Sequence, residues 1–448
     1  AIVPVKHPEK IVRTASTDQP IIMAGDGEGI VDLAASGLVT GHELLFYSGT
    51  FADDPDELRA QLDHDAALVL TDTNRREARR WGTVRDNTGI TERPGQKPLR
   101  VDPKDQRLEL FPDANDDAFT VKDVQGGVWA EATSYGNSVS LTPEDDPVNA
   151  VDGDRGTSWR IGGFSSATGE ALRLTYKDPV TTDHLTLLQA IGGPRNRFIT
   201  QVEVSLDGRE PFTVELGDES HTEDPASDGQ RVDFDEQTFS TMDIKVTETD
   251  PGKLRRYDGI SSVGFAEVGV VDKSGDRPVA DDVIRLPTDL LGTAGKASIA
   301  NQLAIVLTRQ RVAGTVAVRS DPERAMARTF SLPDERSFDL VGQVRLSNSA
   351  ADPVVDQALG LPDAQHGGVT ASSKRRLPGG LENRAMNAID DDPDTWYSPG
   401  FLGQQGEYLS YEVPKPITFS SMDLTVLNDG RHSVPRILRL EVDGKVAQ

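Results

Sequence analysis

The sequence predicts a mixed multidomain protein, in which a small α/β domain with a parallel sheet precedes two antiparallel β-sandwich modules. The α/β domain is indicated by strand-like and helix-like segments that alternate within residues 20–81. The sandwiches are indicated by a sequence that occurs twice, as NAVDGDRGTSW at 149–159 and as NAIDDDPDTWY at 387–397. Each copy is followed, at nearly the same separation, by a second matching stretch that ends at Gly208 or Gly444. Two motifs that recur in the same order indicate that one module is present twice.

The length of the chain and these patterns together predict four segments. A chain of 448 residues is too long for one ordinary core. We expect an α/β domain with a polar connection, a first sandwich, a connecting segment with one helix and strands, and a second sandwich, at 1–125, 126–273, 274–345 and 346–448. The second copy stops just after Gly444, whereas the first continues to a strand-like segment at 263–271. We therefore expect an incomplete second sandwich in a fragment of a longer protein.

Three apolar strands and three helices are expected in the N-terminal domain. The strands are PIIMAG, ELLFYS and AALVLTD, at 20–25, 43–48 and 66–72. The helices are at 28–38, 53–63 and 74–81, of which the last is basic and capped by Thr73 or Asn74. The glycines of GDGEG at 25–29 fit a tight turn better than a dinucleotide site, because Ile30 stands where the fingerprint needs a third glycine.

The first sandwich module contains segments in which apolar and polar residues alternate. These segments are 171–176, 184–189, 200–206 and 242–248. A period of two, interrupted by Gly and Asp turns, is typical of an antiparallel sandwich. In the connecting segment we expect a helix across 297–310 and strands at 315–320 and 337–347.

The charge and composition exclude several classes of partner and site. The chain has 73 acidic and 47 basic residues, and its net charge of −26 would repel nucleic acid and anionic lipid. It has no cysteine, which excludes disulfides and thiolate metal sites. No apolar run reaches transmembrane length. The sequence has no HExxH motif, no GxSxG motif and no cysteine nucleophile, so it indicates no catalytic residue.

The acidic turn of the first copy is a candidate metal site. Asp152, Asp154 and Thr157 would present oxygen atoms towards the inside of the turn, and Glu267 on the last strand would supply another. Calcium binds about 6–8 oxygens of such mixed origin, so we expect a structural Ca²⁺ that pins a long loop. An Asx-type turn that binds no metal is the alternative.

The acidic turn of the second copy offers a reduced set of ligands. Asp390, Asp392 and Thr395 stand at the matching positions. Asp391 replaces the glycine of the first copy, and the sequence contains no counterpart of Glu267. A Ca²⁺ site and a metal-free turn are both compatible with this copy.

The loop after the LTLLQ strand is a candidate carbohydrate site. Sugar recognition uses planar donors such as Arg and Asn, together with an aromatic ring against the apolar face of the sugar. The first copy supplies Arg195, Asn196, Arg197 and Phe198, and the second supplies Arg431 and His432, with Tyr397 and Phe401 nearby. Solvated hairpin loops are the alternative. We expect Trp159 and Trp396 to be core residues.

The two repeats resemble the discoidin, or coagulation factor 5/8 type C, family of jelly-roll modules. The resemblance is carried by AVDGDRGTSW and AIDDDPDTWY together with the strand pairs that follow them. It implies modules that bind carbohydrate and hold a structural calcium, which by position would lie on Asp152, Asp154, Thr157 and Glu267.

The whole chain resembles the extracytoplasmic part of actinobacterial membrane α-(1→3)-arabinofuranosyltransferases, which help to build cell-wall arabinan and lipoarabinomannan. The resemblance includes GDGEGIVDLAASGL, LTDTNRREARRWG and GRHSVPRILRLEVDG. It implies a periplasmic segment that is tethered to the membrane through a transmembrane portion of the same parent chain. That portion would transfer arabinose from a polyprenyl-linked donor, so this segment is expected to be non-catalytic and to hold an arabinan-type glycan acceptor.

Two other roles are compatible with the sequence. The sandwiches could be purely architectural and bind no sugar, and large flat apolar patches would favour this role. The α/β domain could be an independent enzyme, because Asp72, Asn74 and Arg75 follow the third strand, where ligands bind in such sheets. Helix capping and solvation explain these three residues about as well.

Overall fold

The computed structural model describes most of the chain, in two compact units at 1–347 and 348–448. The described residues are 16–79, 88–96, 111, 114–136, 145–163, 165–190, 197–222, 224, 227–251, 261–308, 326–342, 346, 350–377, 380–400 and 406–447. No helix formed by these residues is both long enough and apolar enough to cross a lipid bilayer.

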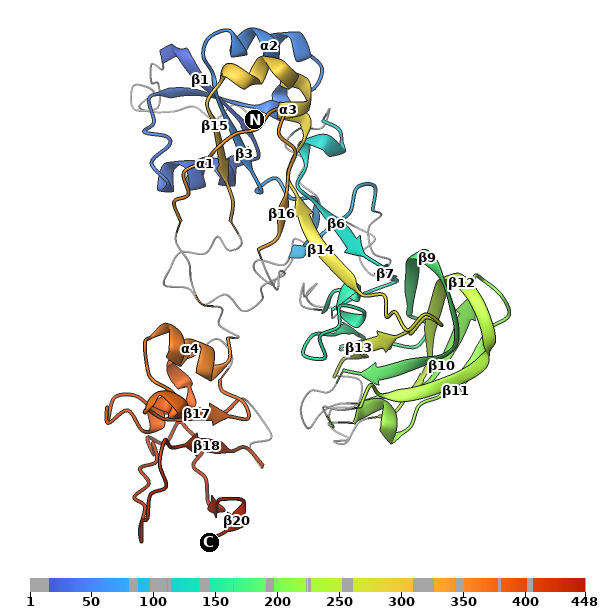
Figure 1. Ribbon diagram of the computed structural model, residues 1–448, viewed down its shortest axis with the longest axis vertical. Coiled ribbons are helices and arrows are strands. Elements are labelled where there is room, and N and C mark those ends of the chain that lie inside the picture. The colour runs from blue at the N-terminus through green and yellow to red at the C-terminus, as the bar shows by residue number, and fades with distance from the viewer. Residues whose placement is uncertain are drawn as a thin grey trace. The chain divides into compact units, whose positions relative to one another are not determined.

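A parallel sheet of four strands forms the N-terminal layer, in the order β15-β3-β1-β2 (Figure 1). Its strands are β1 (Ser16–Ala24), β2 (Glu43–Tyr47), β3 (Ala67–Thr71) and β15 (Leu303–Val306). Its helices are α1 (Gly27–Ala35), α2 (Pro55–Leu62) and α3 (Asp289–Ala294), with short 3-10 turns at Ser48–Phe51 and Gly295–Ala300. The parallel α/β layer that the sequence predicts is therefore present.

Both faces of this sheet are covered, which explains why its strands are continuously apolar. Met23 and Val69 pack against Leu33 of α1 on one face. Ile22 and its neighbours on β3 pack against the α2 and α3 leucines on the other face, Leu58, Leu62, Leu290 and Leu291. Successive side chains along β1 point to opposite faces of the sheet, so each packs against one of the two helix layers.

Two of the predicted helices are wrong. Within 74–81, the chain forms strand β4 (Glu77–Arg79), which pairs with β5 (Thr88–Thr91). The backbone there is already bonded to a neighbouring segment, since the Arg76 N–H donates to the Thr120 carbonyl and the Thr120 N–H donates to the Asn74 carbonyl. Within 297–310, Leu303–Val306 is β15, which adds a fourth strand beside β3. Tertiary pairing overrides helix propensity in both places.

One antiparallel sheet of seven strands builds the first sandwich, in the order β11-β10-β12-β9-β13-β8 with β7 also paired to β9. Its strands are β7 (Val128–Ala132), β8 (Trp159–Ile161), β9 (Ala171–Gln189), β10 (Ile199–Leu206), β11 (Phe212–Glu215), β12 (Gln230–Thr249) and β13 (Val263–Gly269). Short 3-10 turns at Pro147–Ala150 and Asp218–His221 complete it. The predicted segments 171–176 and 184–189 are the two halves of the single strand β9.

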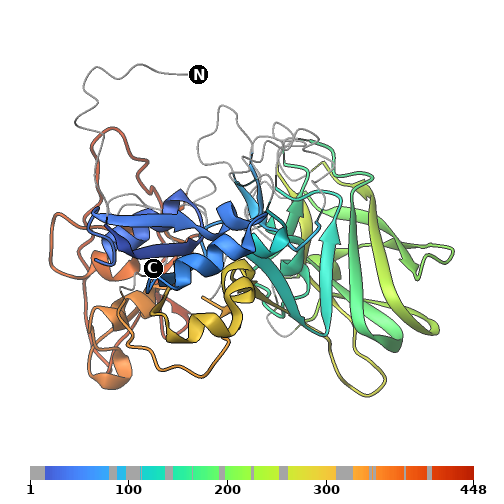
Figure 2. The same cartoon turned by 90° about the horizontal axis from the view of Figure 1, so that it is seen from above.

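The two longest strands fold this sheet around its core (Figure 2). The first half of β9 pairs with β7 and its second half pairs with β13. Strand β12 follows β9 along both halves, with register shifts at Asp233/Gln237 and Phe239/Thr241. Such irregularities bend a strand and increase its twist. The enclosed core contains Trp159, which stacks on Phe265 with 6.2 Å between ring centroids.

A third sheet continues from the α/β layer into the sandwich. It contains β6 (Val121–Gly126), β14 (Ala280–Arg285) and β16 (Arg328–Thr329), and a 3-10 turn at Asp116–Ala118 precedes it. Buried Lys122 on β6 pairs with Asp146 and, at 2.9 Å, with Asp282 on β14. Of the strands predicted further along, 315–320 lies outside the described residues. Within 337–347 the described residues form no strand, and Leu340 is 97% exposed.

The second unit does not form the predicted antiparallel sandwich in its described residues. It contains α4 (Asp352–Ala358), the strand pairs β17 (Thr370–Ser373) with β18 (Leu409–Glu412) and β19 (Glu441–Val442) with β20 (Lys445–Val446), and 3-10 turns at Ala364–His366, Leu381–Asn383 and Ala385–Ala388. In the first module, β12 pairs with β10, and the apolar side chains of β10 are buried. Among the described residues, no such strand pairs with the matching ILRLEV segment, and Ile437 is 91% exposed. The two copies of the repeat therefore share their local turn structure. The described residues of the second copy do not form the sheet of the first.

Asp289, at the start of α3, gives the α/β domain a pH-dependent stability. Burial raises the pKa of its carboxyl to about 6, although a hydrogen bond from Ser48 lowers it. The folded protein therefore binds this proton more tightly than the unfolded chain. The contribution to stability is complete below the ordinary pKa of 3.8 and is lost as the pH rises through about 6.

We predict that Asp289→Asn raises the free energy of unfolding at pH 7 by up to about 3 kcal/mol and flattens its decline between pH 4 and pH 7. Urea unfolding at several pH values measures this. Exposed Asp53 provides the control, since Asp53→Asn should leave the slope unchanged. An unaltered slope in Asp289→Asn would contradict the assignment.

Candidate functional site

The acidic turn of the first copy is held by its own side chains. The Asp152 carboxylate accepts from the Asp154 N–H and from the Thr157 hydroxyl, both at 2.8 Å. The Thr157 hydroxyl also lies 2.8 Å from the Asp154 carbonyl oxygen. Gly153 makes the turn possible because its φ is 78°, in the left-handed region.

The acidic turn of the second copy repeats these contacts. The Asp390 carboxylate accepts from the Asp392 N–H at 3.1 Å and from the Thr395 hydroxyl at 2.8 Å. Asp391, which replaces the glycine, has a φ of 62°. Asp tolerates this conformation better than most residues. The two copies therefore share one turn geometry, despite the substitution that separates their sequences.

Glu267 lies beside the first acidic turn, where its carboxyl interacts with Asp152 and Gly153. Its side chain is buried on β13, where Oε2 accepts from Arg277 at 2.8 Å and Oε1 accepts no hydrogen bond. Burial raises the pKa of this carboxyl to about 7, and the Asp152 charge adds to the rise, whereas Arg277 and the Gly153 N–H lower it. Among the described residues, no three His, Asp or Glu side chains gather closely enough to form a metal cluster by themselves.

Arg197 is a structural residue of the sandwich and not an exposed donor. Its Nε donates to the Ser261 carbonyl at 2.9 Å, and its Nη2 donates to the Gly162 and Ser165 carbonyls at 2.8 and 2.9 Å. It is only 7% exposed. The carbohydrate role predicted for its guanidinium is therefore unsupported, because these donors are already bonded inside the protein. Arg195 and Asn196 lie outside the described residues.

Phe198 presents a half-buried ring at the start of β10. It stacks on His221 with 3.9 Å between ring centroids and 15° between planes. The Phe198 N–H donates to the Asp250 carboxylate at 2.7 Å, which fixes the backbone. His221 cannot be recognised as part of this site from the sequence, because it lies on a separate 3-10 turn and only the folded sheet brings it to Phe198. The pair is an aromatic candidate in the described part of the first module.

Tyr397 takes the place of Trp159 in the second copy. Trp159 Nε1 donates to the Ser134 carbonyl just after β7, and the Tyr397 hydroxyl donates to the Arg375 carbonyl just after β17, at 2.9 and 2.6 Å. Burial raises the pKa of Tyr397 to about 12. Its place in this copy is therefore that of a packing residue. The prediction that Trp396 is a core residue is wrong, because it is 41% exposed.

Arg431 and His432 form an exposed turn around Asp429. Both backbone N–H groups donate to Asp429 Oδ1, at 2.9 and 3.1 Å, and the His432 ring nitrogen lies 2.9 Å from the same oxygen. These bonds lower the pKa of Asp429 to about 2. The side chains of Arg431 and His432 are accessible, as a binding role requires. By contrast, the Tyr397 hydroxyl is bonded to the Arg375 carbonyl. Phe401 lies outside the described residues.

The carboxyl end of the parallel sheet is closed by its own contacts. Asp72 is fully buried and accepts from the Thr308 N–H at 3.0 Å and from Arg328 Nε at 2.7 Å. The GDGEG segment is the tight turn that the sequence predicts, since a side chain at Gly25 would lie 2.1 Å from the Thr71 hydroxyl. The proposed polar-ligand site at Asp72 is therefore an internal ion pair, which argues against an independent enzyme there.

These features define a β-rich chain that joins an α/β layer to a folded antiparallel sheet. No family model and no curated protein matches it. The chain is similar to the cryo-EM structure of arabinofuranosyltransferase AftD from mycobacteria, with a TM-score of 0.55 and 17% identity over 90% of this chain and 30% of that chain. A mutant form of AftD gives a TM-score of 0.57 over the same shares of the chains, also at 17% identity. At this identity the similarity establishes a shared fold.

A further similarity is to the family 32 carbohydrate-binding module of C. perfringens NanJ in complex with galactose. It has 16% identity over 36% of this chain and all of that module, with a TM-score of 0.23. This score is too low to support an argument. The chain spans less than a third of the AftD structures that it matches.

We predict that Arg197→Ala lowers the free energy of unfolding by about 2–5 kcal/mol, because it leaves buried carbonyls without donors. Arg431→Ala should leave unfolding unchanged, since that side chain is exposed. Denaturant unfolding of the two variants checks the contrast. Equal stabilities would show that Arg197 is not structural.

Proposed function

We propose that this chain is the glycan-binding, extracytoplasmic portion of a membrane arabinofuranosyltransferase and that it positions an arabinan-type acceptor. The observation that carries the proposal is the fold shared with AftD over 90% of this chain. The transfer reaction belongs to a transmembrane portion of the same parent chain, because this sequence has no recognisable catalytic motif. That portion would tether the segment at the periplasmic face of the membrane.

The edge of the first sandwich is the place we propose for the acceptor. An aromatic face binds the apolar face of a sugar ring, and neighbouring polar groups bind its hydroxyls. The Phe198–His221 stack supplies the aromatic surface. Arg195 and Asn196 precede it in the sequence and remain candidate donors on that ground. In the second unit, exposed Arg431 and His432 are the corresponding candidates.

We expect arabinofuranose oligosaccharides to bind the full chain saturably and Phe198→Ala to weaken this binding about tenfold, because the variant removes the ring that would stack on the sugar. Isothermal titration calorimetry measures both. Phe234→Ala is the matched control, because Phe234 belongs to another aromatic pair of the same sandwich, with Phe212 at 5.7 Å. Absence of heat from a folded protein with any glycan would refute the proposed function.

A structural Ca²⁺ in the first copy is part of the proposal. The Oε1 atom of Glu267 is buried next to Asp152 without a hydrogen bond of ordinary geometry, although the Gly153 N–H interacts with the carboxyl, and a cation would supply Oε1 with a direct partner. Asp152, Asp154, Thr157 and Glu267 would hold the ion, together with backbone carbonyls, and the ion would cross-link the turn to β13. In the second copy, Asp390, Asp392 and Thr395 are the matching candidates.

We predict that millimolar Ca²⁺ raises the melting temperature by roughly 2–5 °C. Glu267→Gln should abolish this shift, and Asp390→Asn should retain it if the first copy is the stronger site. Differential scanning fluorimetry, with Mg²⁺ as the control ion, provides the measurement. The same shift in Glu267→Gln as in the parent protein would exclude the assigned ligands.

The second unit favours an additional, architectural role. Its exposed apolar side chains include Ile417, Phe419, Met422, Leu424, Ile437 and Leu438. Concentrated exposed apolar surface is typical of a packing interface. This observation concerns 417–446, and it leaves the proposed glycan site of the first module unaffected.

A further inference from the structure

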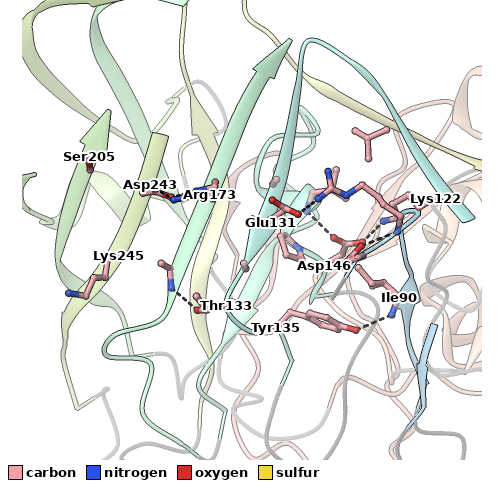
Figure 3. Close-up of a pocket in the computed structure, with 18 of the residues that line it drawn as sticks. Ile90, Lys122, Glu131, Thr133, Tyr135, Asp146, Arg173, Ser205, Asp243 and Lys245 are labelled. Atoms are coloured by element: carbon pink, nitrogen blue, oxygen red, sulfur yellow. Dashed lines mark hydrogen bonds and ion pairs between the residues drawn. The ribbon is translucent and has the colours of Figure 1, made fainter. Parts of the chain in front are cut away.

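A groove of about 860 Å³ lies against the outer face of the first sandwich (Figure 3). Its floor comes from β7, β9, β12 and β10, and its wall comes from β5 and β6 with the 3-10 turn at Pro147–Ala150. The volume falls within the range of small-molecule sites, about 300–1,000 Å³. This groove is separate from the acidic turns and from the Phe198–His221 pair, none of which lines it.

The floor is a row of polar side chains that crosses the sheet. Register pairs Glu131 with Arg173, Arg173 with Asp243, and Asp243 with Ser205, so one residue of each strand joins the row. Arg173 binds Asp243 in a bidentate manner, through Nε at 2.6 Å and Nη2 at 2.8 Å. The Arg173 guanidinium and the Asp243 carboxylate are therefore held in fixed orientations before a ligand binds.

A second row lies one pleat further along the same face. Lys245 pairs in register with Ala171 and with Glu203, and its ammonium lies 3.3 Å from the Glu203 carboxylate. Thr133 stands at the end of this row. Both rows therefore offer donors and acceptors side by side, at the strand spacing of about 4.8 Å.

The described part of the groove wall is held by ion pairs and a hydrogen bond. Buried Lys122 is clamped between Asp146 and Asp282, and the Tyr135 hydroxyl accepts from the Ile90 N–H at 3.0 Å. Arg93 reaches from the wall to the floor, where it pairs with Glu131. These contacts hold the described side chains in place before a ligand binds, which lowers the cost of ordering them on binding.

The charges of the lining balance. Among the described residues, four cationic and four anionic side chains line the groove: Arg93, Lys122, Arg173, Lys245, Glu131, Asp146, Glu203 and Asp243. An anionic or cationic ligand would face repulsion from half of them and would have to break existing ion pairs. A neutral polyhydroxylated ligand can accept from the cations and donate to the carboxylates without changing the balance. Charge complementarity therefore favours a neutral glycan.

We propose that this groove binds a neutral oligosaccharide, with the Arg173–Asp243 pair as its central contact. The proposal rests on the proposed glycan-binding function, and it adds a second, extended site on the sheet face. A chain held there and at the Phe198–His221 edge would contact one module twice. Two weak sites on one rigid module raise the overall affinity by increasing the effective concentration of the second.

Trp129 provides a fluorescence readout of ligand binding in the groove that is separate from calorimetry. It lies on β7, two residues before Glu131 and on the same sheet face, and the Arg93 guanidinium is 6.0 Å from its ring centroid. A ligand that engages the Arg93–Glu131 pair would change the surroundings of this indole. The chain also contains Trp81, Trp159 and Trp396, so the difference between the parent protein and a Trp129→Phe variant isolates the fluorescence of Trp129, which reports on the groove.

The test is calorimetric and fluorescence titration of the full chain with neutral arabinofuranose oligosaccharides and with uronic acid oligosaccharides of equal length. We expect the Arg173→Gln, Asp243→Asn double variant to bind the neutral series about tenfold more weakly and to lose the Trp129 response. The Glu236→Gln, Lys273→Gln double variant is the control, because it removes an exposed ion pair of the same sandwich outside the groove. Melting temperatures of both variants verify folding.

The outcomes separate the groove from the proposed function. Binding that survives the groove variant and is lost in Phe198→Ala would overturn the groove and retain glycan binding at the edge. Tighter binding of the uronic acid series would overturn the neutral ligand class. No binding of any glycan by the parent protein would refute both proposals. Loss of affinity and of the fluorescence response in the groove variant alone would establish this site.

Discussion

The pairing of the two long strands β9 and β12 is the constraint on which the rest of the first module depends. The strands stay paired along both halves, while two register shifts bend them. One half then packs with β7 and the other with β13, so a single sheet encloses its own core. This bend brings Glu267 on β13 to the acidic turn that precedes β8. It also aligns Arg173 and Asp243 across the outer face.

The two repeats show how far local interactions can define a structure. Both acidic turns contain the same hydrogen bonds, and both end-of-strand Asp-Gly pairs have left-handed φ angles, 49° and 69° at Asp207–Gly208 and 50° and 72° at Asp443–Gly444. These features depend on neighbours in the sequence and therefore form in both copies. The sheet depends on distant partners, and only the first copy has them among the described residues.

Charged residues of this acidic chain serve two different purposes. Arg197, Arg328 and Lys122 are buried with carbonyl or carboxylate partners and hold segments together. Arg173 and Lys245 are accessible on the sheet and are paired across strands. A buried charge must keep its partners, whereas an accessible pair can exchange part of its contacts with a ligand. This difference decides which charged residues belong to a candidate glycan site.

The sequence by itself determined the first three strands and two helices of the α/β layer and the duplicated turns. Periodicity, capping and turn residues act over a few positions and are visible in one dimension. Only the tertiary structure decided that 303–306 is a strand, that Arg197 is buried and that His221 stacks on Phe198. It also decided that the groove exists at all. Each of these depends on which distant segments pair, because burial and hydrogen-bond partners follow from the sheet order and not from local sequence.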